Sequence, residues 1–216
     1  NPVITTSIVS NFPLTHINRI SGSQVYNFTE GTGSILLHVI AQPEGKKLNA
    51  VVEGNLKITN GKAVYGPRSM PFNKINASIK ITDKDIYIEN LTCVTGKSIL
   101  ELKGNAPGLI DFIRNGKADL KLSWTIKSPH IFLQDFVTFL GKRKSISPQK
   151  RKSTPKFYQE GSKFEKYLEA CELDLHIDVK NIEFENFSAT AILGNITMAD
   201  NDWHINKMQM KHADGQ

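Results

Sequence analysis

The sequence predicts a mainly β protein: an antiparallel meander or curved sheet, groove-like or sandwich-like, with two or three short helices. The first observation is the segment KADLKLSWTIK, Lys117 to Lys127, in which apolar and polar residues alternate without interruption. A period of two is typical of a strand with one buried face. The same alternation recurs in INASIKI (75–81), SILELK (98–103) and ELDLHIDVK (172–180).

Turn signals between the apolar segments are the second observation. SILLHVIA (34–41) and AVVEGNLKI (50–58) are predicted to be early strands. Asn60-Gly61 follows the second of them, and Asn-Gly is the pair most typical of a two-residue hairpin turn. We therefore expect a hairpin at this position, within an antiparallel meander.

Helical spacing is confined to short segments. GLIDFIRN (108–115) has room for about two turns of helix. Residues 131–141 place apolar side chains at helical spacing and predict an amphipathic helix that covers the sheet. SKFEKYLEACE (162–172) predicts another short helix before the last strands.

The chain is expected to form one β-rich domain interrupted by a linker. Residues 1–141 are predicted to be a β-rich module that ends in the amphipathic helix. Residues 142–163 are a basic, Ser- and Pro-rich segment and are predicted to be a mobile linker. Residues 164–216 supply the short helix and a second set of strands that complete the same domain. Because the chain opens without a leader, we expect it to be a fragment of a longer protein.

The positive charge is concentrated in that linker. The net charge is +6, yet 142–156 holds seven Lys or Arg and no acid, so the remainder has 20 basic against 21 acidic residues. A basic groove spread over the fold is therefore missing, which argues against nucleic acid as a partner. The linker is either a solvated loop or a contact with anionic lipid headgroups, worth about 1 kcal/mol per basic residue. The candidate membrane-surface residues are Lys142, Arg143, Lys144, Lys150, Arg151 and Lys152.

No motif for catalysis or metal binding is present, so we expect a protein that is not an enzyme and has no cofactor. Asp174, His176 and Asp178 stand in a row, but the alternation places them on the solvated face of a strand. Cys93 and Cys171 match no metal or redox spacing. They are either two buried thiols or a pair that forms in an oxidising compartment.

An internal repeat relates two parts of the chain. IKITDKD (79–85) and ITMADND (196–202) are alternating strands that end in an Asp-x-Asp turn, and they are offset by 117 residues. At the same offset Ile88 aligns with Ile205 and Leu91 with Met208. A repeated hairpin of this kind lengthens a sheet.

Several motifs together resemble a known family. They are GNLKITNG (54–61), the run from Pro71 to Asn105 with its G-x-S-x-L-x-L-x-G strand at 96–104, and SPHIFLQDF (128–136). In this order they are similar to the C-terminal region of the AsmA family of Gram-negative envelope proteins, which is related to TamB and the bridge-like lipid-transfer proteins. The similarity covers roughly 54–130 and 173–215.

The resemblance implies a β-rich periplasmic body whose parent protein is anchored in the inner membrane and takes part in outer-membrane biogenesis. Its sheet would curl into a groove for the acyl chains of phospholipid or another lipid, and further expected partners are envelope proteins. The family has no catalytic residues to carry over, and the basic insertion after Gly141 has no counterpart in it.

The candidate groove residues are the inward members of the alternating strands. They are Ile79, Ile81, Leu100, Leu102, Leu120, Leu122, Trp124, Ile126, Leu173, Leu175, Ile177 and Val179. The alternative is a closed sandwich core, capped by the 131–141 helix, in a non-catalytic scaffold for outer-membrane assembly. The free energy of burial does not distinguish the groove from the closed core. Covering apolar surface stabilises by about 25 cal/mol per Å² whether protein or lipid covers it. Carbohydrate binding is disfavoured, because Trp124 and Trp203 do not supply a row of exposed aromatics.

Overall fold

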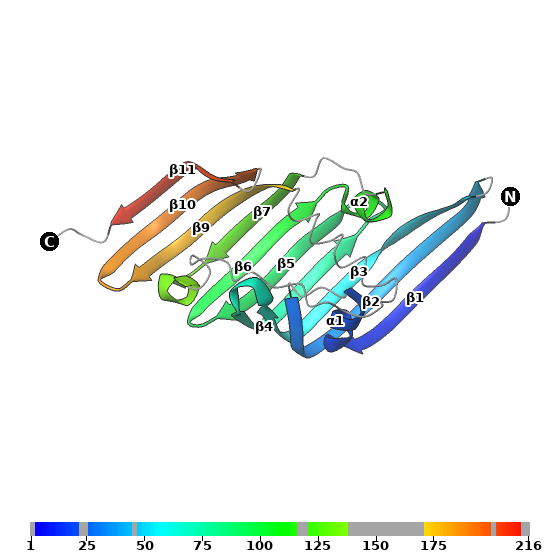
Figure 1. The fold of residues 1–216 in the computed structure, drawn as a ribbon, viewed down its shortest axis with the longest axis horizontal. Coiled ribbons are helices and arrows are strands. Elements are labelled where there is room, and N and C mark those ends of the chain that lie inside the picture. Colours follow the sequence, from blue (N-terminus) through cyan, green and yellow to red (C-terminus); the bar gives the residue numbers. More distant parts are fainter. Residues whose placement is uncertain are drawn as a thin grey trace, which may run out of the picture.

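The strands form one open, curved sheet in the computed structural model of the chain (Figure 1). The structure describes residues 3–21, 26–44, 47–115, 121–137, 171–199 and 202–212. Within these ranges all eleven strands belong to a single sheet. The predicted mainly β class is confirmed, and its sandwich-like form is wrong for this part of the chain, because no second sheet is present in it.

The elements follow one another along the chain with few interruptions. The strands are β1 Ile4–Pro13, β2 Tyr26–Glu44, β3 Lys47–Tyr65, β4 Met70–Ile81, β5 Ile86–Thr95, β6 Ser98–Ala106, β7 Lys121–Ser128, β8 Ile131–Phe132, β9 Glu172–Phe184, β10 Phe187–Ala199 and β11 Asp202–His212. The helices are α1 Thr15–Ser21 and α2 Leu109–Asn115, and the 3-10 turns are η1 Gly66–Arg68 and η2 Leu133–Phe136.

Neighbours in the sequence are neighbours in the sheet, with one exception. β1 to β7 form an antiparallel meander, β9 pairs in parallel with β7, and β10 and β11 continue in antiparallel order. β8 also pairs in parallel with β9. The strands on both sides of the predicted linker therefore share one sheet. The linker, 142–163, and residues 162–170 of the predicted short helix lie outside the described residues.

The predicted internal repeat is present as two hairpins with identical strand pairing. Ile79 pairs with Ile88 in β4–β5, and Ile196 pairs with Ile205 in β10–β11. The β-bulges of the two hairpins also coincide: the register shifts after Ser78 in one and after Asn195 in the other. Lys74 and Ala191, which are equivalent at the offset of 117, both have a φ of 51°.

The Asn60-Gly61 hairpin is a wrong prediction. β3 continues through both residues, and Asn60 forms a β-bulge with a φ of 49°. Its backbone N–H donates to Asn76 Oδ1 of β4 at 3.1 Å, so a side chain on the neighbouring strand satisfies the group that a turn would have left free. The Cβ that any other residue would place at Gly61 would lie 2.9 Å from the buried side chain of Leu14.

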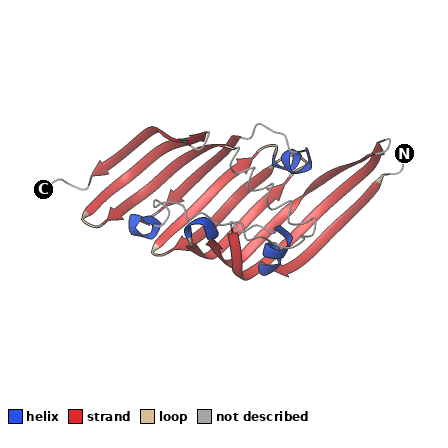
Figure 2. Ribbon diagram, viewed as in Figure 1, coloured by secondary structure: helices blue, strands red, loops and turns tan. Residues whose placement is uncertain are grey.

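The described helical segments lie near the ends of the strands and not along the middle of the sheet (Figure 2). Leu14 and Ile17, at the start of α1, pack on β3, β4 and β5. Leu109 and Phe112 of α2 pack on β6, β7 and β9. Ile131 of β8 packs on β9 and β10. Among the described residues the core is thus divided into three separate clusters.

The amphipathic helix predicted over residues 131–141 does not begin as a helix. Ile131 and Phe132 form β8, and a single 3-10 turn, η2, follows. Residues 138–141 lie outside the described part. The cause is tertiary: Phe132 N–H donates to Ser98 Oγ at 2.9 Å. Asp135 Oδ2 accepts from Lys97 N–H at 2.9 Å and from Ser98 N–H at 3.0 Å.

Replacing Asp135 by alanine should destabilise the fold. The Ser98 hydroxyl also donates to Asp135 Oδ2, at 2.8 Å, and Ser98 is fully buried. The substitution leaves buried donors unpaired, so the free energy of unfolding should fall by about 2 kcal/mol. Urea denaturation checks this. The matched control is Asp178→Ala, whose ion pair with Lys127 is exposed and worth less than about 1 kcal/mol. Equal losses in the two variants would contradict the assigned role.

Candidate functional site

The candidate groove residues lie on one face of the sheet, which we call the apolar face. Residues opposite each other on neighbouring strands point to the same side of a sheet. Leu122, Trp124 and Ile126 of β7 lie opposite Leu173, Leu175 and Ile177 of β9, in that order. The structure thus brings together eleven of the twelve candidates, and Leu120 lies outside the described residues.

Two rows of directly paired residues cross the apolar face from β1 to β11. The first row is Ser10, Ile35, Leu56, Ile79, Ile88, Gly104, Trp124, Leu175, Ile196 and Ile205. The second row is Phe12, Gly33, Ile58, Ala77, Leu91, Leu102, Ile126, Ile177, Gly194 and Met208. Neither row contains a charged residue. With ten strands in the path and about 4.8 Å between strands, each row is about 43 Å long.

The candidates differ in how far protein covers them. Leu122, Leu173 and Val179 are buried, the first two beneath α2 and the third beside β8, so these three are core residues. The other eight described candidates are half-buried. Leu102 and Ile126 lie opposite each other and belong to none of the three core clusters.

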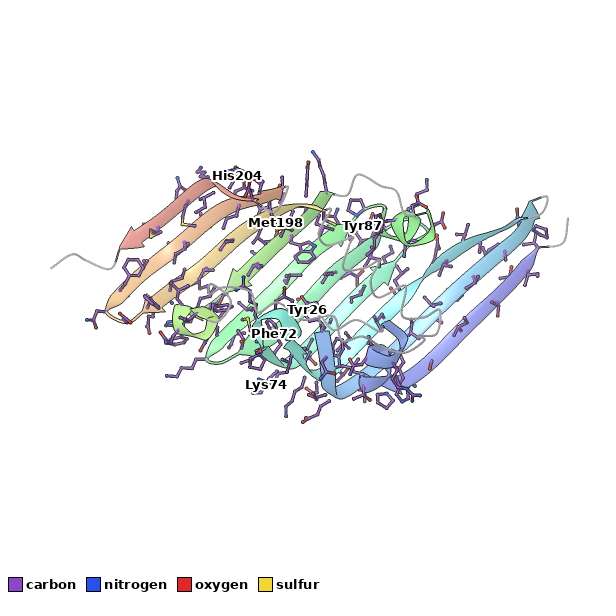
Figure 3. The ribbon with its side chains drawn as sticks, in the orientation of Figure 1. Tyr26, Phe72, Lys74, Tyr87, Met198 and His204 are labelled. Atoms are coloured by element: carbon purple, nitrogen blue, oxygen red, sulfur yellow. The ribbon has the colours of Figure 1, made fainter. Side chains whose placement is uncertain are left out.

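Leu102 and Ile126 form a strip across the middle of the apolar face, which we call the middle strip. The core clusters on its two sides lie at opposite ends of the strands. Met198 packs on the cluster beneath α2, and Phe72 packs on the cluster around Leu14. Figure 3 shows Met198 toward one end of the strands and Phe72 toward the other. The strip that contains Leu102 and Ile126 lies between them.

Trp124 places a buried polar atom in the first row. Its ring lies across Gly104, where a Cβ would come within 2.2 Å of Trp124 Cδ1, so glycine makes room for the indole. The indole Nε1 is buried and has no hydrogen-bond partner among the described residues. A buried donor without an acceptor is costly.

The opposite side of the sheet, the polar face, carries exposed ion pairs. Lys121 Nζ lies 3.2 Å from Glu172 Oε2, and Lys127 Nζ lies 3.3 Å from Asp178 Oδ2. Asp178 pairs with Lys127, whereas His176 Nε2 lies 3.5 Å from Asp174 Oδ2, so the three residues of the predicted row do not converge on one site. The lysines of β7 thus pair with acidic residues of β9 on the polar face.

Other sequence candidates do not add a site. In the described ranges no cluster of His, Cys, Asp and Glu could hold a metal ion, and no helix is long and apolar enough to cross a membrane. Asp85 has a structural role: its Oδ1 accepts from Gly108 N–H at 2.9 Å and its Oδ2 from the Tyr87 hydroxyl at 3.1 Å. The six candidate membrane-surface residues between 142 and 152 lie outside the described residues.

Sequence reasoning missed the members of the two rows that lie nearest the edges of the sheet. These include Ile35 and Leu56 on one side, and Ile196, Ile205 and Met208 on the other. Their alternation was visible in SILLHVIA, GNLKI and GNITM. The sequence does not show the strand register, and it is the register that aligns those segments with Trp124.

Comparison of the chain with protein-family models, with characterised proteins and with solved structures finds no match. The resemblance to the AsmA family rests on the sequence motifs alone.

The Cys93 thiol, buried in the Leu14 cluster, should make stability depend on alkaline pH. Burial raises its pKa from 9.0 to about 11. Below pH 9 the thiol is protonated in both states, whereas between pH 9 and 11 it ionises only when the chain unfolds. The free energy of unfolding should fall by about 2–3 kcal/mol across that range.

The measurement is urea denaturation from pH 8 to 11 in a Cys171→Ala background, with Cys93 present or replaced by alanine. Subtracting the second series from the first removes the titration of Lys and Tyr residues. A difference that does not change with pH would show that Cys93 ionises as readily in the folded chain as in the unfolded one.

Proposed function

We propose that the apolar face binds acyl chains, and that the protein is a non-catalytic lipid-binding module of an envelope protein of the AsmA type. The observation that carries the proposal is the pair of mostly apolar rows, free of charged residues, on one face of a single sheet. A protein core needs apolar residues where two layers meet. Here the second row continues through Leu102 and Ile126, which belong to no core cluster among the described residues.

The chemistry of the rows fits an extended aliphatic ligand. Each buried CH₂ group of an acyl chain gains about 0.8 kcal/mol, and rows about 43 Å long exceed the roughly 30 Å hydrocarbon core of a bilayer. These features favour phospholipid or another acyl-chain lipid over a compact polar ligand.

The envelope setting is part of the proposal and rests on the resemblance to the AsmA family. It includes a periplasmic location, a parent anchored in the inner membrane, and a contribution to lipid transport in outer-membrane biogenesis. The competing function is a scaffold for outer-membrane assembly, in which the middle strip would be covered by protein and not by lipid.

A photo-crosslinking residue at Ile126, compared with one at Thr125, tests the proposal. The two positions are adjacent and face opposite sides of β7, so they report on the apolar and polar faces separately. In the full-length parent in Gram-negative cells we expect phospholipid adducts, detected by mass spectrometry, at Ile126 and not at Thr125. Protein adducts alone at Ile126 would favour the scaffold.

Trp124 fluorescence gives a second test in purified protein. The chain has two tryptophans, so Trp203→Phe leaves Trp124 as the reporter. Phospholipid with brominated acyl chains should quench Trp124 strongly, because a bromine atom must lie in contact with the ring to quench it. The same lipid with unlabelled chains is the control. Unchanged emission at saturating lipid would place acyl chains away from Trp124.

A further inference from the structure

The uncovered part of the apolar face narrows to two side chains at β7. The alternate residues of this strand on that face are Leu122, Trp124, Ile126 and Ser128. Leu122 and Ser128 are each 3% exposed, whereas the two residues between them are half-buried. The residues opposite them on β9 have the same order of burial. A lipid chain that follows the two rows from β6 to β10 must therefore cross these two side chains.

Trp124 is the larger of the two, and its position depends on Gly104 of β6. Gly104 lies directly opposite Trp124. A Cβ at Gly104 would overlap the indole at Cδ1 and would lie 2.9 Å from its Cγ. Both atoms belong to the part of the ring next to the backbone, so they cannot move aside without moving the whole indole. The ring thus occupies space that the side chain of any other residue at 104 would need.

Packing on three sides leaves a displaced indole one direction in which to move. On the side of α2 it packs against the cluster that contains Leu109 and Leu122, which are buried. On the side of β9 it lies opposite Leu175, which packs on the same cluster. On the side of β6 the added methyl group would stand. The remaining side is the middle strip, which belongs to no core cluster among the described residues.

We propose that Gly104 is a positioning residue of the lipid site: it leaves the Trp124 indole its place over β6 and so keeps the middle strip clear for an acyl chain. The inference rests on the proposed function, because a clear strip matters only where a chain crosses it. It also assigns a role to the last glycine of the G-x-S-x-L-x-L-x-G segment at 96–104. Gly104 acts through Trp124 and not through a side chain of its own.

Replacing Gly104 by alanine should move the indole into the middle strip. Lipid binding should weaken by about tenfold, which is the affinity that roughly two buried CH₂ groups provide. The measurement is the amount of tritium-labelled dioleoyl phosphatidylglycerol that co-elutes with the purified chain in gel filtration. In a Trp203→Phe background the same substitution should shift the Trp124 emission to longer wavelength, since the ring leaves its packed position. Binding or emission equal to that without the substitution would overturn the proposal.

A second substitution separates the effect of the ring from that of the backbone. The Cβ at 104 would also lie 2.8 Å from the Ser123 carbonyl oxygen, so alanine strains the pairing of β6 with β7 as well. Trp124→Leu removes the ring and leaves that backbone contact. In this background Gly104→Ala should no longer weaken lipid binding, as a double-mutant cycle measures. An equal loss in both backgrounds would assign the effect to the backbone and contradict the role of Gly104.

Gly61→Ala is the matched control for adding a methyl group to this sheet. Its Cβ would lie 2.9 Å from Leu14 Cδ1 and 3.1 Å from Ile75 Cβ, within a core cluster and outside both rows. Thermal melts should show a loss of stability, while lipid binding below the melting temperature should be unchanged. A similar loss of binding in this control would show that any disturbance of packing weakens binding, and the specific role of Gly104 would be wrong.

Ile126→Trp supplies an independent variant in case Gly104→Ala does not fold. Ile126 is half-buried and lies next to Trp124 on the same face of β7, so a second indole fills the middle strip without a change at 104. Lipid binding should weaken by a similar factor. If the unsubstituted chain binds no lipid, the proposed function fails and this inference with it. If it binds lipid and both variants bind equally well, only this inference fails.

Discussion

The structure depends on keeping the alternation of every strand in phase with that of its neighbours. A shift of one residue would exchange the two faces of a strand, placing lysines beneath the core clusters. The direct pairing of Trp124 with Leu175, and of Gly104 with Trp124, shows that this phase is kept across the change from antiparallel to parallel order. All features of the candidate site follow from that alignment, because the rows exist only while each strand contributes the same alternate residues.

The faces were predictable from sequence because a period of two is a local property. In the described part of 117–127, Trp124 and its alternate neighbours lie on one face and the lysines on the other, as the alternation predicted. The coverage was not predictable. Leu122 is a core residue and Ile126 is only half-buried, because α2 packs over the first and not over the second. The cluster beneath α2 contains residues from three strands, so its position is not a local property of the sequence.

The two wrong predictions of local structure have one cause, which is a contact from elsewhere in the sheet that outweighs a local preference. Asn60-Gly61 has the composition of a turn, but Asn76 accepts the Asn60 N–H and β3 continues. Residues 131–136 have helical spacing, but Ser98 and the β5–β6 turn hold Phe132 and Asp135 in a strand and a 3-10 turn. Neither partner is close in sequence to the segment that it redirects.

The bulges of the repeated hairpin cancel one another. In β4–β5 one extra residue lies on each strand, so the pairing at Asn73 and Val94 has the same register as that at Ile81 and Ile86. A hairpin that corrects its own irregularity can be added to a sheet, or removed from it, without exchanging the faces of the strands on either side. Gene duplication could therefore change the length of such a sheet in whole hairpins while every existing side chain keeps its orientation.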